Sequence, residues 1–176
     1  DFPNRVNSEG EIGLFRSDYH YYNPEGSMYL QDRWEHEGMV INAGIRYDYF
    51  SVGNQLDAAE VENRARDQWS PRVGIAYPIS DRDVFSFHYG RFSQVPDRQY
   101  IFENRGAAVR TRGNPNLENE TTVSYQAALQ HMFTESVTGQ FSVYFKDIFG
   151  LLTIEEVSSG DSPALVTQYV NKDYAS

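Results

Sequence analysis

Apolar and polar residues alternate along several long stretches of this chain. The clearest stretches are 39–49 and 137–145, where every second residue is uncharged and mostly apolar. Successive side chains of a β-strand point to opposite faces, so this period predicts strands with one apolar and one polar face. No stretch has a helical period. We therefore expect seven strands, at 27–35, 39–50, 69–79, 83–94, 120–133, 137–149 and 164–172.

One face of four of these strands carries no charged residue. Its members are Met39, Ile41, Ala43, Ile45, Tyr47, Tyr49, Val73, Ile75, Tyr77, Ile79, Phe85, Phe87, Tyr89, Val137, Gly139, Phe141, Val143 and Phe145. The opposite face holds most of the polar, charged and small residues, including the charged Arg46, Asp48, Arg72 and Lys146 and the titratable His88. One face of the sheet therefore meets an apolar environment, and the other meets water or polar groups.

The connections between the strands alternate between short and long. Short turns are expected at 36–38, 80–82 and 134–136, and long loops at about 51–68, 95–119 and 150–163. Strands of a soluble sandwich typically have about 5–6 residues, whereas strands of a membrane barrel need about 9–11. Membrane barrels also combine short periplasmic turns with long external loops. The pattern therefore predicts an all-β fold, an antiparallel meander of about seven long strands that forms part of a transmembrane β-barrel.

A barrel assigns each face of the strands to an environment. The residues expected to face lipid are Ile41, Ile45, Ile75, Phe85, Phe87, Phe141 and Phe145. The residues expected to face the lumen are Arg46, Asp48, Arg72, His88 and Lys146. Aromatic residues near the long-loop ends are expected to form an interfacial girdle: Tyr47, Tyr49, Phe50, Trp69, Tyr89, Phe92 and Phe149. Asp32 shares the apolar face of 27–35, so we expect it near the turn or beside a bulge.

Composition narrows the function classes. The net charge of −10 argues against a nucleic-acid partner, and the absence of cysteine excludes disulfides and thiolate metal sites. Aromatic residues make up 15% of the chain although its mean hydropathy is −0.61, as expected where polar and apolar residues are interleaved. No second histidine or carboxylate lies at ligand spacing from His88, and no nucleophile is positioned beside a carboxylate pair. We therefore expect no enzyme, no cofactor and no metal site.

The most basic part of the chain's long loops lies between residues 97 and 112. Arginine offers planar paired donors and aromatic rings offer faces, so this loop predicts contact with an anionic or aromatic ligand. The candidate substrate-binding residues are Arg98, Tyr100, Phe102, Arg105, Arg110 and Arg112. The alternative is that these arginines pair with loop carboxylates or with lipopolysaccharide phosphates.

Several segments resemble barrel strands of TonB-dependent outer-membrane receptors, especially those with a carboxypeptidase-regulatory-like N-terminal domain. These segments are YLQDRWEHEGMVINAGIRYDYF (29–50), WSPRVGIAYPISDRDVFSFHYGRFSQVP (69–96), GNPNLENETTVSYQAALQHMF (113–133), SVYFKDIFGLL (142–152) and QYVNKDYAS (168–176). They recur in the family's order and at its spacing.

The resemblance implies a 22-stranded barrel in the bacterial outer membrane, plugged by an N-terminal globular domain. Residues 1–176 would then be a fragment of that barrel wall without the plug or the TonB box. The implied partners are the remaining strands and plug of the same protein, outer-membrane lipid and lipopolysaccharide, TonB through an N-terminal part outside this chain, and a surface lipoprotein cap.

The function implied by the resemblance is import of a scarce nutrient, with this chain supplying wall and external loops. Two alternatives stay open at this point. A non-transporting outer-membrane barrel for adhesion or structure would lack a plug and a TonB-contacting segment. A soluble all-β binding module of the sandwich type would instead bury Ile41, Ile45, Phe85, Phe87 and Phe141 within protein.

Overall fold

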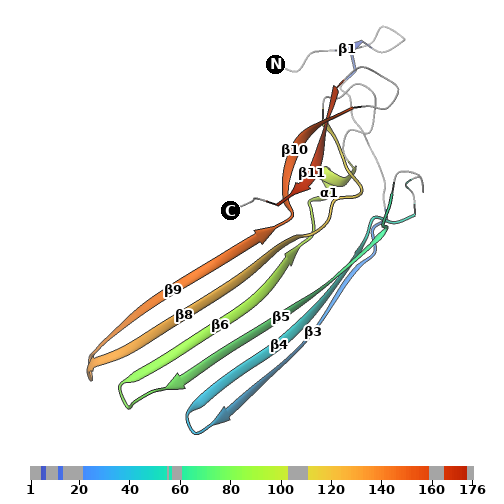
Figure 1. Ribbon diagram of the computed structural model, residues 1–176. Coiled ribbons are helices and arrows are strands. Elements are labelled where there is room, and N and C mark those ends of the chain that lie inside the picture. Colours follow the sequence, from blue (N-terminus) through green and yellow to red (C-terminus); the bar gives the residue numbers. More distant parts are fainter. Residues whose placement is uncertain are drawn as a thin grey trace.

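A computed structural model describes residues 5–6, 12–13, 22–54, 56, 61–102, 111–158 and 165–173. Its elements are β1 (Arg5–Val6), β2 (Ile12–Gly13), β3 (Glu25–His36), β4 (Met39–Ser51), β5 (Ala65–Pro78), β6 (Asp83–Gln94), α1 (Arg98–Phe102), β7 (Thr111–Arg112), β8 (Glu120–Thr134), β9 (Val137–Phe149), β10 (Leu151–Ser158) and β11 (Leu165–Lys172). Strands β3, β4, β5, β6, β8 and β9 form one antiparallel sheet in chain order (Figure 1). The predicted all-β antiparallel meander is confirmed.

The two ends of this sheet differ. The three tight turns that join β3 to β4, β5 to β6 and β8 to β9 lie at one end, and α1, β10 and β11 lie at the other (Figure 1). In the first turn, Glu37 and Gly38 both have positive φ, 49° and 81°, as a two-residue hairpin turn compatible with strand twist requires. The short and long connections therefore alternate as the sequence predicts.

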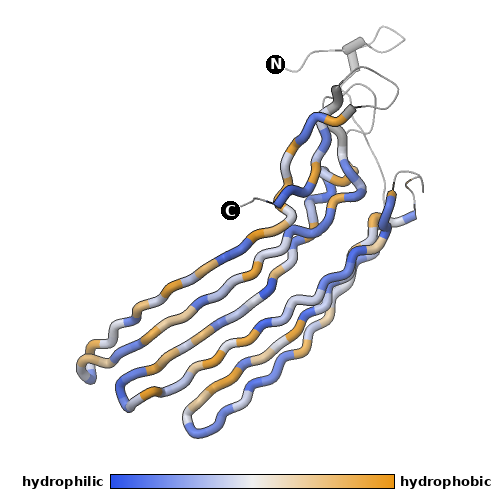
Figure 2. Tube along the Cα trace, in the orientation of Figure 1, coloured by the Kyte–Doolittle hydropathy of each residue, from blue (hydrophilic) through white to orange (hydrophobic). Residues whose placement is uncertain are grey.

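The cross-strand register sorts side chains into rows on two faces. One row of the apolar face crosses all six strands through Trp34, Ile41, Ile75, Phe87, Ala127 and Val143. The adjacent row on the polar face comprises Arg33, Asn42, Gly74, His88, Gln126 and Tyr144. This alternation along each long strand is visible in Figure 2. The residues predicted to face lipid thus share one face, and those predicted to face the lumen share the other.

The six-stranded sheet is a single layer in the described part of the chain. Ile45 is 41% exposed, Phe85 39% and Phe141 71%, so no second sheet among the described residues covers the apolar face. A soluble sandwich would bury these side chains against a facing sheet. The exposed apolar face therefore argues against the sandwich alternative.

The apolar face has the height of a membrane. It extends along β4 from Met39 to Tyr49, ten positions apart. At about 3.3 Å per residue this is about 33 Å along the strand. A strand tilt of about 40° reduces it to about 25 Å along the membrane normal, the height of the apolar band of outer-membrane barrels. Among the described residues no helix is long and apolar enough to cross a membrane.

The long loops contain more regular structure than the sequence indicated. Strand β5 starts at Ala65, four residues before the predicted start, which shortens the expected 51–68 loop. The expected loop 95–119 contains α1 and β7, and the expected loop 150–163 contains β10. The predicted seventh strand is β11, which pairs with β10 and β7 in a separate three-stranded sheet rather than extending the meander.

Three expected placements are wrong. Asp32 lies neither near the turn nor beside a bulge, because it pairs with Ala43 within an unbroken register. It is in the apolar-face row of Val73, Tyr89 and Phe145, and its Oδ1 accepts a hydrogen bond from the Arg33 N–H at 2.8 Å. Phe50 is buried at 2% exposure instead of joining an interfacial girdle. Phe92 is on the polar face, beside Gly90.

We predict that Gly150→Ala destabilises the barrel by about 1–2 kcal/mol. Gly150 separates β9 from β10 at a φ of 67°, and an added Cβ would lie 3.3 Å from the Asn119 carbonyl oxygen. The measurement is the urea midpoint for refolding of the full-length protein into lipid vesicles. Gly26→Ala is the control, because a Cβ there meets nothing within 4 Å. Equal midpoints for the two variants would contradict the prediction.

Candidate functional site: the external cap and the polar wall

A small hydrophobic cluster lies at the long-loop end of the sheet, and we call it the cap core. It consists of Phe50, Val52, Leu56, Val61, Ile101, Phe102 and Leu117. These residues come from connections that are far apart in the sequence, and Val95, Tyr100, Leu152 and Tyr169 pack around them. Burial of these side chains brings the long connections together into one structure, which we call the external cap because the sequence predicts these connections on the external side.

The segment 113–118, Gly-Asn-Pro-Asn-Leu-Glu, holds the cap together through its asparagines. Asn114 donates from its backbone N–H to the Tyr100 carbonyl and from Nδ2 to the Tyr169 carbonyl, both at 2.8 Å. Its Oδ1 accepts from the Asn116 N–H at 2.9 Å. Asn116 Oδ1 in turn accepts from the Glu62 N–H at 2.9 Å. This segment therefore joins the connection between β4 and β5, helix α1 and strand β11.

Asn171 makes the equivalent junction on β11. Its Oδ1 accepts from the Glu118 N–H at 2.7 Å, while its Nδ2 donates to the carbonyls of Glu118 at 3.0 Å and Gly150 at 2.7 Å. Asp173 accepts from the Gly150 N–H at 2.7 Å. The β10–β11 hairpin is thus fixed to the top of β8 and β9 by side-chain bonds to backbone groups.

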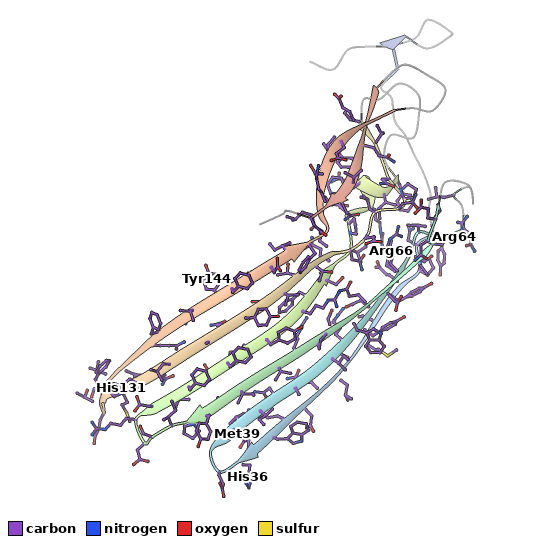
Figure 3. The ribbon with its side chains drawn as sticks, viewed as in Figure 1. His36, Met39, Arg64, Arg66, His131 and Tyr144 are labelled. Atoms are coloured by element: carbon purple, nitrogen blue, oxygen red, sulfur yellow. The ribbon has the colours of Figure 1, made fainter. Side chains whose placement is uncertain are left out.

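Two arginines at the top of β5 serve the same purpose. Arg64 donates to the carbonyls of Gly53 at 2.7 Å and Leu56 at 2.9 Å, and Arg66 donates to the Pro115 carbonyl at 2.5 Å. Both are labelled at the long-loop end of the sheet in Figure 3. Arg64, Arg66, Asn114 and Asn171 were not among the residues predicted from the sequence to be functional. The only available signal was the density of asparagine, proline and glycine around 113–116, which favours turns bonded by side chains.

The structure distributes the predicted substrate-binding residues among different roles. Arg98 forms an exposed ion pair with Glu25 at 3.2 Å. The Tyr100 ring packs on Tyr169 with centroids 4.8 Å apart, and Phe102 is in the cap core at 3% exposure. Arg105, Arg110 and the side chain of Arg112 lie outside the described residues. Contact of this set with a substrate stays a prediction, and the described members have partners within the cap.

A groove of about 590 Å³ follows the polar face of β3 to β8. Arg46, Arg72 and His88 line it, while Asp48 and Lys146, predicted to share this face, do not. Arg46 makes a paired contact with Asp48, at 2.8 and 2.9 Å from Nε, and Arg72 stacks on the Phe92 ring 4.6 Å from its centroid. Lys146 lies 5.9 Å from the ring centroid of Tyr144, which Figure 3 labels on β9.

This wall offers hydrogen-bond donors and acceptors rather than reactive groups. No three histidine or carboxylate side chains gather at metal-binding distance in the described part of the chain. His88 lies over Gly74, where an added Cβ would come within 2.8 Å of its Nδ1. The glycine therefore lets the ring lie flat against the wall, a packing role. The arrangement is suited to contact with polar or anionic surfaces.

We predict that Asn114→Ala loosens the external cap, because it removes two side-chain hydrogen bonds worth about 1–3 kcal/mol together. The measurement is the rate at which externally added protease cleaves the full-length protein in intact cells. Asn63→Ala is the control, since Asn63 makes a single exposed bond to the Ala65 N–H. Equal cleavage rates for the two variants would count against the role assigned to Asn114.

Comparison with known proteins agrees with this architecture. The family model described as TonB dependent receptor-like, beta-barrel matches residues 1–175. TonB-dependent heme receptor A of Haemophilus influenzae strain 86-028NP is 26% identical over 148 residues, covering 71% of this chain and 20% of the relative. Its counterpart in strain ATCC 51907 / DSM 11121 / KW20 / Rd is 25% identical over 147 residues, with the same coverage. The chain thus spans about a fifth of the length of these relatives. It belongs to the TonB-dependent receptor family and corresponds to part of the family's β-barrel.

Proposed function

We propose that this chain forms wall and external cap of a TonB-dependent transporter that imports a scarce nutrient across the bacterial outer membrane. The observation that carries the proposal is the two-faced, single-layer sheet. Its apolar rows have the height of a bilayer, and its polar rows contain a groove that meets no second layer among the described residues. A barrel that encloses a polar lumen requires both features.

The partners follow from the two faces and the cap. Outer-membrane lipid covers the apolar face, while the plug domain of the same protein contacts the polar face. The cap lies on the external side and meets lipopolysaccharide, nutrient and, where present, a surface lipoprotein. TonB acts through other parts of the protein. This segment carries out no covalent chemistry and serves as a framework for transport.

We predict that Phe145→Arg impairs assembly into the membrane by about 2–4 kcal/mol, the cost of a cation near the middle of the bilayer. Phe145 is 62% exposed in a central row of the apolar face. Tyr144→Arg is the matched control, because Tyr144 is also aromatic, adjacent in sequence and on the polar face at 75% exposure. The measurement is the heat-modifiable gel mobility of the receptor from outer membranes. Assembly of both variants at the same level would overturn the assignment of the faces.

Heme is the first nutrient to supply in a growth experiment, because both relatives carry the name heme receptor. We predict that cells depending on this receptor grow on a scarce nutrient only while TonB is present. The measurement is growth on heme as the sole iron source, compared with other chelated iron sources, in strains with and without TonB. Growth that is independent of both receptor and TonB on every source would favour an adhesive or structural barrel instead.

A further inference from the structure

The ladder between β5 and β6 stops halfway up the sheet. Its last pair toward the cap is Arg72 with Gly90, although β5 continues upward to Ala65 and β6 to Gln94. The neighbouring ladders β4–β5 and β6–β8 continue to Ala65 and Gln94. The upper parts of β5 and β6 visibly diverge (Figure 1). We call residues 65–71 and 91–94 the seam.

Pro71 explains where the ladder ends. It directly follows the last pair on the way to the cap, and a proline has no N–H to donate to a ladder. Proline inside sheets is confined to free edges, strand starts and bulges. From Pro71 upward β5 has an edge without a backbone partner among the described residues, so a proline in this otherwise central strand is accommodated. The seam is therefore encoded in the sequence Trp69-Ser70-Pro71-Arg72.

Side chains close the seam in place of backbone bonds. Gln68 reaches from β5 toward β6 and β8 and lies 3.2 Å from Thr121 Oγ1. With its amide turned so that the oxygen faces the Arg91 guanidinium, Oε1 accepts from Arg91 Nε at 3.0 Å and from Thr121 Oγ1. Higher up, Arg66 donates to the Pro115 carbonyl. Such contacts break individually, whereas a backbone ladder separates cooperatively. In the described sheet, the seam is thus the section where side-chain contacts take the place of the β5–β6 ladder.

The seam also holds buried polar atoms that no described residue satisfies. Ser70 Oγ, on a residue 1% exposed, and Arg66 Nη1, on a residue 9% exposed, have no hydrogen-bond partner among the described residues. Buried polar groups of this kind are normally satisfied by ordered water. Ser70, Arg72, Gly90 and Phe92 also line the groove of the polar face. The groove therefore extends to the lower end of the seam.

We propose that the seam is a lateral opening in the barrel wall, latched by Gln68 and hydrated from the lumen groove. The inference rests on the proposed membrane placement, because only there does the wall separate the lumen from lipid. Trp69, on the outward face at 53% exposure, places the opening at the level of the external membrane interface. Release of the Gln68 contacts widens it and exposes Ser70 to water.

The first test uses cysteine pairs in the full receptor, since this chain has no cysteine of its own. The seam pair combines Ser70→Cys with Phe92→Cys. These two positions would lie opposite each other if the β5–β6 ladder continued two residues above Arg72 and Gly90. Ala76→Cys with Ser86→Cys is the matched control, because these residues are opposed on the same two strands. After mild oxidation in membranes, free thiols are counted by polymer-linked maleimide. We expect the control pair to form a disulfide and the seam pair to keep both thiols. Equal oxidation of the two pairs would overturn the proposal.

The second test measures the latch. The starting protein is a Ser70→Cys receptor, and the readout is the rate at which a membrane-impermeant maleimide labels the thiol introduced by that substitution. Adding Gln68→Ala should raise this rate about tenfold, because the bonds that close the seam are lost. Adding Gln130→Ala, another polar-face glutamine that lies outside both the seam and the groove lining, should leave the rate unchanged. Labelling that does not respond to Gln68→Ala would contradict the latch. Failure of the membrane placement itself would appear separately, as equal assembly of the Phe145→Arg and Tyr144→Arg variants.

Discussion

The backbone ladders of the six-stranded sheet are the constraint on which the rest of the structure depends. Each ladder fixes a register, and with side chains alternating at every residue the register decides which residues face outward. A slip by one residue in β4 would exchange Ile41 and Ile45 for Asn42 and Arg46 on the apolar face. Lipid makes this exchange costly, because it hydrates neither charged side chains nor unpaired backbone groups. The same ladders place Arg72 and His88 in the polar groove.

The external cap is stabilised by a different mechanism. There side chains bond to backbone groups of neighbouring segments: Asn114, Asn116, Asn171 and Arg64 each bond to backbone groups of another part of the cap. Among the described charged residues of the cap, Arg66 donates to the Pro115 carbonyl, and Arg98 pairs with Glu25 at the start of β3. The wall and the cap meet at the seam, where ladder bonds give way to side-chain bonds.

The sequence predicted those parts of the structure that follow from period two. Strand positions, the two faces and the turns followed because alternation is a local property of residues such as 39–49. The β10–β11 hairpin was missed because Leu151–Ser158 follows β9 with only Gly150 between them, and only its pairing with β11 distinguishes it from a loop. The burial of Phe50 and Phe102 was missed because the cap core forms between residues far apart in the chain. The effect of Pro71 depends on which neighbour pairs with β5, which no local pattern reveals.

The most direct test of the two-faced wall is a nitroxide scan of residues 39 to 50 in the intact receptor, reconstituted in lipid bilayers. Collision rates with oxygen, which concentrates in lipid, and with a water-soluble nickel complex are measured at each position. We expect oxygen accessibility to alternate with period two, with maxima at Ile41, Ala43 and Ile45 and the nickel complex favoured at Asn42, Gly44 and Arg46. Equal accessibility of both sets to the water-soluble reagent would contradict the placement of this sheet in a membrane.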